Sequence, residues 1–97
     1  MRIISRRILR DFSEKHPDAT IPLQTWYHDV KRAVWKSPAE ITAVYKNASI
    51  LANNRVVFNI KGNRYRLVVI VVYQYGVVYI RFVGTHAEYD RIDALLI

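Results

Sequence analysis

Two apolar segments in the second half of the chain are joined by only three residues, and this connection constrains the fold most. Residues 64–73 read RYRLVVIVVY and residues 77–84 read VVYIRFVG, with QYG between them. Segments rich in Val, Ile and Tyr are typical of strands, and so short a connection favours an antiparallel return. A third apolar run, RVVFNIKGN, comes before them and closes in a Lys61–Asn63 turn. We therefore predict an antiparallel meander of these three strands.

The first half of the chain shows helical spacing instead. MRII at its start is compatible with a short first strand. In the following SRRILRDFSEKHP, Ile8, Leu9 and Phe12 share one helical face. Ser5 precedes this segment as a candidate N-cap. Because proline disfavours helical backbone in the residue before it, we expect the helix to end at His16.

A second helix is predicted over residues 22–35, with Thr20 as a candidate cap. Residues 37–41 predict a short third helical turn, with Ser37 as its cap and Glu40 three residues later. Residues 45–54 are expected to form a loop, since Asn and Ser cluster there. The apolar stripe of the second helix, which we interpret as core, consists of Leu23, Trp26, Val30, Ala33 and Val34.

Helices followed by an antiparallel meander predict an α+β fold. The chain has 97 residues, of which 52% are hydrophobic, and it contains no repeat or linker. We therefore expect one domain over residues 1–97. It has no cysteine, its longest apolar run is LVVIVVY, and no targeting segment is apparent. A membrane span needs roughly 18 apolar residues, so we expect a protein of the reducing cytoplasm that does not contact membranes.

The charge of the chain points to a polyanionic partner. Fifteen Lys and Arg oppose eight Asp and Glu, which gives a net charge of +7, and ten of the fifteen are Arg. Arginine binds two phosphate oxygens at once, so this balance favours nucleic acid as the partner. The alternative is a basic surface without a specific ligand, because net charge determines association rather than fold.

Side-chain alternation predicts where the strand arginines point. On the long strand, one face carries Arg64, Arg66, Val68 and Ile70, and the other carries Tyr65, Leu67, Val69 and Val71. On the last strand, the residues expected to share a face are Val77, Tyr79, Arg81 and Val83. An arginine is costly to bury without a partner. We therefore expect Arg66 and Arg81 on the side of the sheet that the helices leave open to a ligand.

The sequence contains no metal or nucleotide motif. The histidines at 16, 28 and 86 are far apart, and the carboxylates have no metal-ligand spacing. The three glycines do not form a dinucleotide fingerprint or a P-loop. No serine lies in a nucleophile elbow. We therefore predict no metal site and no cofactor.

Titratable residues concentrate in GTHAEYDRID, residues 84–93, directly after the last strand. His86 together with Arg, Lys and Tyr side chains suits metal-free cleavage of RNA. The 2′-hydroxyl needs a base, the leaving 5′-oxygen needs an acid, and the phosphorane needs cations. A strand end is a rigid support, and we expect Gly84 to let the backbone bend there. This bend would place His86 and Tyr89 beside Arg66.

The same residues also have structural interpretations. A lone histidine at a strand end is more often a capping or surface residue than a catalytic one. Thr85 and Glu88 form the pattern of a capping box for a short terminal helix, in which Tyr89 would pack its ring. The remaining structural interpretations are an ordinary exposed turn residue for Lys61 and a solvated helix face for residues 90–93.

The segments RVVFNIKGNRYRLVV and VVYIRFVGTHAEYDRID closely resemble the HigB-type toxins, which are mRNA interferases of the RelE superfamily. The resemblance is strong over residues 55–93 and looser through the helical half. It implies a RelE-like fold, with N-terminal helices packed on a small, mainly antiparallel sheet. It also implies a type II toxin that cleaves mRNA on translating ribosomes. A HigA-like helix-turn-helix antitoxin would neutralise it, and DNA would be contacted only through that antitoxin.

The resemblance also implies roles for individual residues. Tyr65–Arg66 matches the tyrosine–arginine pair that opens the long strand in RelE-like enzymes, which makes Arg66 the leading phosphate-binding candidate. His86 matches the basic position after the final Val-Gly, and Tyr89 matches the C-terminal tyrosine of the superfamily. The catalytic candidates are therefore Arg66, His86 and Tyr89.

Three further basic residues are RNA-binding candidates. Lys61 and Arg64 fall near the variable basic positions of the superfamily. Similar sequences often continue YRLVV with a basic or polar residue, whereas this chain has Ile70 there. Ile70 shortens the cationic track along the strand and leaves Arg81 as its substitute.

We therefore predict a metal-independent endoribonuclease that cleaves mRNA on the ribosome by 2′-hydroxyl attack and so inhibits translation. The alternative is a basic module that binds RNA or the ribosome without cleaving. A third interpretation is a structural partner protein. The residues leave open which group acts as acid and which as base.

Overall fold

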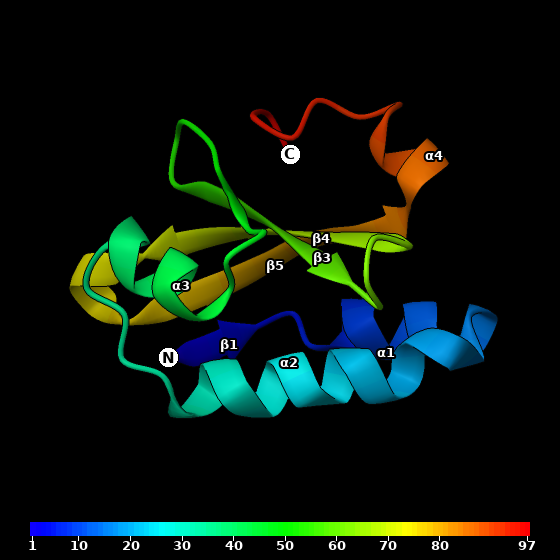
Figure 1. Cartoon of the computed structure of the whole chain (residues 1–97), viewed down its shortest axis with the longest axis horizontal. Coiled ribbons are helices and arrows are strands. Elements are labelled where there is room, and N and C mark those ends of the chain that lie inside the picture. Colours follow the sequence, from blue (N-terminus) through cyan, green and yellow to red (C-terminus); the bar gives the residue numbers. More distant parts are fainter.

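The computed structural model describes residues 1–97, and its strands form a five-stranded mixed sheet (Figure 1). The strands are β1 (Arg2–Ile4), β2 (Ser49–Ile50), β3 (Arg55–Ile60), β4 (Tyr65–Val72) and β5 (Val77–Thr85), and their order in the sheet is β1-β5-β4-β3-β2. The meander of β3, β4 and β5 is antiparallel, as predicted. β2 pairs antiparallel with β3, and β1 pairs parallel with β5.

Helices lie on both sides of this sheet (Figure 1). The α-helices are α1 (Arg7–Lys15), α2 (Thr20–Arg32), α3 (Pro38–Val44) and α4 (His86–Tyr89), and two 3₁₀ turns are η1 (Pro17–Ala19) and η2 (Tyr73–Tyr75). α1 and α2 cover one face, whereas α4 and the C-terminal segment lie on the other. The predicted α+β fold is therefore confirmed. Each helix is too short or too polar to cross a bilayer.

The ends of α1 and α2 differ in part from the predictions. α1 ends at His16 before proline, as expected, but Ser5 is not its cap: it has left-handed backbone, with φ of 72°, and Arg6 precedes the helix. Thr20 is not a cap either, because η1 runs directly into α2 and places Thr20 in its first turn. α2 ends at Arg32, since Ala33 turns to extended backbone.

Two further predictions in the first half need correction. Ser37 precedes α3, but its hydroxyl donates to the Glu40 carboxylate, at 3.5 Å, and does not cap the helix backbone. The segment expected to be loop contains β2, whose two residues pair with the middle of β3. β2 is short and exposed, and no alternation of hydrophobic residues signals it.

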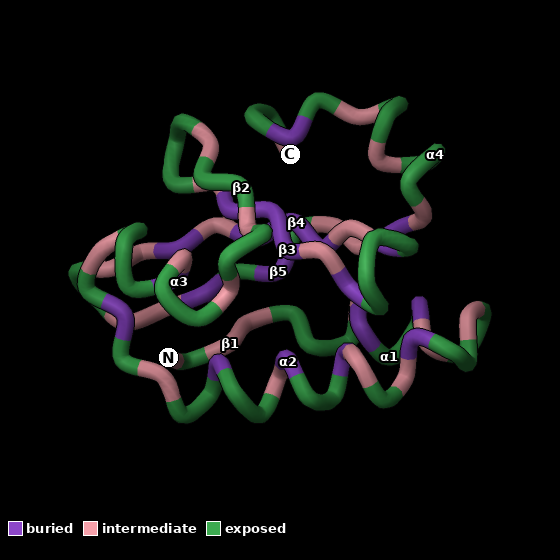
Figure 2. The backbone as a smooth tube through the Cα atoms, in the orientation of Figure 1, coloured by how far each residue is buried: buried purple, intermediate pink, exposed green.

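The main core lies between the sheet and the two long helices (Figure 2). Tyr65, Leu67, Val69 and Val71 of β4 all belong to it, so the predicted alternation of this strand is confirmed. The helices contribute the inner-face residues Leu9, Phe12, Leu23, Trp26 and Val30. Trp35, beyond the end of α2, stacks on Phe58 with ring centres 6.1 Å apart.

The opposite face of the sheet is not open along its whole length. Val57 of β3 and Val68 of β4 form a second, smaller core with Ala94. The residues that flank this core are Leu51, Phe82, Tyr89, Ile92 and Ile97. The expectation of an open face was therefore wrong for this part of the sheet, because its apolar strand residues are covered by the C-terminal segment.

A β-bulge changes the faces of β5. Val68 pairs with Phe82 and the next residue, Val69, pairs with Ile80, so Arg81 has no partner across the sheet. Before the bulge, Val77 and Tyr79 lie opposite Val72 and Ile70, on the Arg66 face. After it, Val83 lies opposite Leu67 and packs on the helix-side core. The prediction that Val83 shares a face with Val77, Tyr79 and Arg81 was therefore wrong.

Gly84 is required for its size rather than for a bend. β5 continues through Gly84, which pairs with Arg66, and the turn into α4 follows Thr85. A Cβ atom at this position would lie 2.5 Å from Cζ of Phe82 and 3.1 Å from Oε1 of Glu88. Only glycine leaves room for the Phe82 ring, so the expected bend at Gly84 was wrong.

Candidate active site

Arg66, His86 and Tyr89 come together where β4 begins and β5 ends. Arg66 pairs with Gly84 across the sheet, and α4 begins two residues after Gly84. Nη2 of Arg66 lies 2.9 Å from Nε2 of His86. Cζ of Arg66 lies 5.9 Å from the centre of the Tyr89 ring. The structure thus brings together the three residues predicted from the sequence as catalytic candidates.

A capping box holds α4 in the orientation that makes this cluster. The Thr85 hydroxyl accepts from the backbone N–H of Glu88 at 3.2 Å, and the Glu88 carboxylate accepts from the backbone N–H of Thr85 at 2.8 Å. This confirms the capping box predicted from the sequence. The bond from the Thr85 N–H lowers the pKa of the Glu88 carboxyl. His86 and Tyr89, three residues apart, therefore emerge on the same side of α4.

His86 contacts Arg66 and Asp90 through its two ring nitrogens. A guanidinium only donates, so the 2.9 Å contact with Nη2 of Arg66 is a hydrogen bond in which Nε2 of His86 accepts. Nδ1 faces Oδ2 of Asp90 at 3.4 Å. Asp90, four residues after His86, thus orients the imidazole. The arrangement places an accepting ring nitrogen beside a cation.

Two asparagines hold the other side of Arg66. Nη1 of Arg66 donates to Oδ1 of Asn59 and to Oδ1 of Asn63. Asn59 lies directly opposite Arg66 on β3, and Asn63 lies in the turn between the two strands. Neither asparagine was predicted from the sequence, nor was the contact of Asp90 with His86. A signal was available only for Asp90, whose spacing of four residues suits one helical face.

Lys61 and Arg64 are not part of this cluster. Both pair with Oδ2 of Asp18 in η1, at 3.1 Å for Lys61 Nζ and 3.6 Å for Arg64 Nη1. The Tyr65 hydroxyl donates to Oδ1 of the same carboxylate at 2.6 Å. Arg64 precedes β4 and reaches the helix side, so its predicted place on the Arg66 face was wrong. Asp18 instead ties the β3–β4 turn to the helical layer.

These contacts shift the ionisation of the groups that make them. The bond from the Tyr65 hydroxyl, followed by that from Lys61, lowers the pKa of the Asp18 carboxyl. The same bond to the carboxylate raises the pKa of the Tyr65 hydroxyl. A lowered pKa in the folded state means that the unfolded chain binds more protons in acid. The stability contributed by Asp18 is therefore present above its ordinary pKa and is lost as pH falls through the folded-state pKa.

Replacing Asp18 with asparagine should therefore make the free energy of unfolding less dependent on pH in the acid range. We expect Asp18→Asn to be less stable than wild type at neutral pH, and its free energy of unfolding to fall less steeply below about pH 4. Urea unfolding followed by tryptophan fluorescence between about pH 3 and pH 7 measures both effects. Asp11→Asn is the charge-matched control on α1. Equal pH dependence in wild type and Asp18→Asn would contradict this account of Asp18.

The remaining RNA-binding candidate, Arg81, lies in the bulge of β5. Its side chain is exposed and takes part in none of the ion pairs. Ile70 lies on the Arg66 face and is half-buried opposite Tyr79. The structure therefore shows no continuous cationic track from Arg66 along β4.

The Arg66–His86 cluster lies on an open surface. The side chains of His86 and Asp90 are 49% and 63% exposed. Arg66, His86, Tyr89 and Asp90 line none of the three surface hollows of the molecule, and Asn59 lines one of them. The chain has no group of three or more His, Cys, Asp or Glu side chains placed to hold a metal ion. The geometry can hold a phosphate at Arg66 and accept a proton at His86, but it does not enclose a substrate.

Comparisons with known proteins point to one family. Residues 19–92 match the family described as HigB_toxin, RelE-like toxic component of a toxin-antitoxin system. The chain is 31% identical over 97 residues to the mRNA interferase toxin HigB of Escherichia coli (strain K12). The aligned segment covers 98% of this chain and 93% of that protein. The mRNA interferase HigB of Shigella flexneri has the same identity and coverage. That of Escherichia coli O6:H1 is 23% identical over 94 residues, covering 95% of this chain and 91% of that protein.

Proposed function

Because this chain belongs to the HigB_toxin family of RelE-like toxic components, we propose that it cleaves mRNA on the ribosome by attack of the 2′-hydroxyl on the adjacent phosphate. The family predicted from the sequence is thereby confirmed. The observation that carries the proposal is the 2.9 Å contact between Nη2 of Arg66 and Nε2 of His86. It combines a phosphate-binding cation with a proton acceptor at one point.

The proposed reaction assigns one role to each of the three residues. When substrate binds, the 2′-hydroxyl replaces Arg66 as the partner of Nε2 of His86. Nε2 then takes the hydroxyl proton as the 2′-oxygen forms a bond to phosphorus. Arg66 stabilises the added negative charge on the phosphorane. The phosphorus–5′-oxygen bond then breaks, and the Tyr89 hydroxyl, which has no hydrogen-bond partner within the chain, gives a proton to that oxygen. The products are a 2′,3′-cyclic phosphate and a 5′-hydroxyl, and no metal ion takes part.

The open surface of the site supports a requirement for the ribosome. Since the side chains of His86 and Asp90 are 49% and 63% exposed and no pocket surrounds them, the chain by itself does not hold an RNA strand in position. Positioning contributes a large part of a catalytic rate. The ribosome supplies an mRNA held in a fixed path, and the net charge of +7 favours association with ribosomal RNA.

The family also defines a toxin-antitoxin system, so an antitoxin partner is part of this function. We propose that the antitoxin is a HigA-like helix-turn-helix protein, and that the chain contacts DNA only through it. This proposal rests on the resemblance of residues 55–93 to HigB-type toxins and on the family match.

Chemical analysis of the cleaved ends tests the mechanism. Purified protein is incubated with programmed ribosomes at fixed magnesium concentration, after transition metals have been stripped. We expect cleavage to persist and to leave a 5′-hydroxyl with a cyclic or hydrolysed 2′,3′-phosphate. A 2′-deoxy nucleotide at the cleaved position should block the reaction there. A 5′-phosphate product would rule out 2′-hydroxyl attack, and ribosome binding without new RNA ends would favour the non-catalytic module.

A further inference from the structure

The guanidinium of Arg66 is held by side chains from three separate elements. Asn59 of β3 and Asn63 of the β3–β4 turn accept from Nη1, and His86 of α4 accepts from Nη2. Because the guanidinium only donates, the oxygen of each carboxamide faces Arg66 and the NH₂ group faces away. The NH₂ group of Asn59 donates in turn to the backbone oxygen of Asn47 at 3.4 Å. Asn59 is thus itself anchored by the loop before β2.

Two donors of Arg66 have no partner within the chain. A guanidinium has five N–H groups. Two on Nη1 face the asparagine oxygens, and one on Nη2 faces His86. The N–H on Nε and the second N–H on Nη2 have no acceptor within the chain. Two donors on neighbouring nitrogens match two oxygens of one phosphate.

We propose that Asn59 and Asn63 are positioning residues, which orient Arg66 so that its two unpaired donors, on Nε and Nη2, receive the phosphate that is cleaved. This inference rests on the proposed function. Arginine has a long, flexible side chain. If this side chain is already fixed before substrate binds, the entropy cost of ordering it does not add to the barrier of the reaction. Asn63 is held in turn by the contacts of Lys61 and Arg64 with Asp18, so the helical layer also supports the orientation.

Substitution of the asparagines in two backgrounds tests whether they act through Arg66. We expect Asn59→Ala and Asn63→Ala each to lower kcat by about 10- to 100-fold, because a small displacement of a catalytic group has effects of this size. In the Arg66→Ala background the same substitutions should have no further effect. Asn47→Ala is the matched control, since Asn47 contributes only its backbone oxygen. If the asparagine substitutions lower kcat in the Arg66→Ala background by the same factor as in wild type, the proposal is overturned, because the asparagines then act independently of Arg66.

A second measurement does not depend on cleavage. In protein labelled with ¹⁵N-arginine, we expect slow rotation about the Nε–Cζ bond of Arg66 in wild type, seen as separate signals for Nη1 and Nη2. Asn59→Ala/Asn63→Ala should merge these signals, as for a freely rotating exposed arginine such as Arg32. Merged signals in wild type would refute the positioning role even if the protein cleaves mRNA. Separate signals in a wild-type protein that does not cleave would leave the orientation of Arg66 correct and the proposed function wrong.

Discussion

Replacing His86 with alanine is expected to lower the rate of mRNA cleavage by about 10²–10⁴-fold, the range for loss of a proton-transferring side chain. The physical reason is that Nε2 of His86, 2.9 Å from Nη2 of Arg66, is the base in the proposed mechanism. Its removal leaves the 2′-hydroxyl without a base at this point. Single-turnover cleavage on programmed ribosomes measures the chemical step, and growth arrest on expression gives the corresponding effect in cells.

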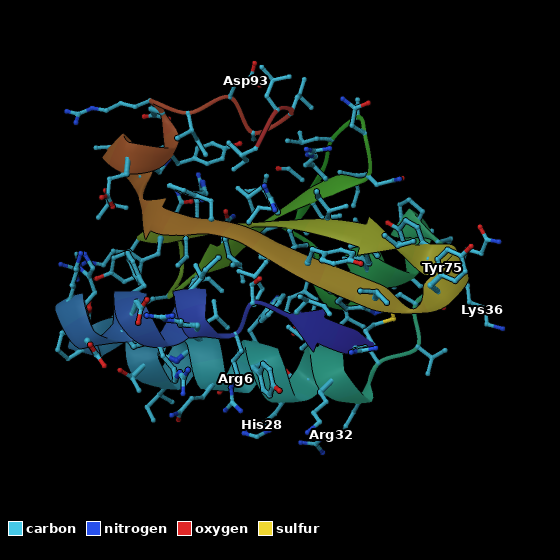
Figure 3. All side chains as sticks on the ribbon, turned by 180° about the vertical axis from the view of Figure 1, so that it is seen from behind. Arg6, His28, Arg32, Lys36, Tyr75 and Asp93 are labelled. Atoms are coloured by element: carbon cyan, nitrogen blue, oxygen red, sulfur yellow. The ribbon has the colours of Figure 1, made fainter.

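The matched control for this substitution is His28→Ala. His28 projects from α2 into solvent, on the far side of the sheet from α4 (Figure 3). The His28→Ala substitution removes the same kind of side chain without touching the Arg66 cluster, so this variant should cleave mRNA at the wild-type rate. Circular dichroism establishes that both variants fold. A folded His86→Ala protein that cleaves at the wild-type rate would show that His86 has no part in proton transfer.

Replacing Arg66 with alanine is expected to lower the rate by about 10²–10³-fold, as for loss of one donor to a developing oxyanion. The substitution removes the cation beside His86 and leaves Oδ1 of Asn59 and Asn63 without their donor. Arg66→Lys should restore only part of the rate, since an ammonium does not bind two phosphate oxygens in a fork. Rates of cleavage on saturating programmed ribosomes distinguish this loss from weaker binding.

Arg32→Ala is the control for net charge. Arg32 is exposed at the end of α2 and points away from the sheet (Figure 3). Both substitutions remove one positive charge, and both should reduce the salt dependence of ribosome binding to a similar extent. Only Arg66→Ala should slow cleavage at saturation. If the two variants lose activity equally, Arg66 contributes no more than its charge.

Several features could be predicted because they depend on residues close together in the chain. The end of α1 before Pro17 and the capping box of Thr85 and Glu88 are examples. The meander follows from apolar runs joined by short turns, and the alternation of β4 follows from the two-residue period of a strand. Each of these signals acts within a few residues and needs no knowledge of a partner element.

The site could be predicted only in part. His86 was singled out by its place after the last strand and Arg66 by side-chain alternation, but the role of Arg66 and the choice of Tyr89 came from the resemblance to HigB-type toxins. The support of Arg66 was missed, since Asn59 reaches it across the sheet and is seven residues away in the chain. Lys61 and Arg64 were placed with the RNA-binding residues, but Asp18, 43 residues before Lys61, binds them both.

The two long helices, the antiparallel meander and the residue types needed for metal-free RNA cleavage follow from the amino-acid sequence, because periodicity and chemical type are properties of the chain. The bulge at Arg81, the covering of Val57 and Val68 by the C-terminal segment, and the contact of His86 with Arg66 follow only from the tertiary structure. These features depend on the register between strands and on side chains that meet across elements. Arg66 and His86 are 20 residues apart, and their contact exists because Arg66 pairs with Gly84.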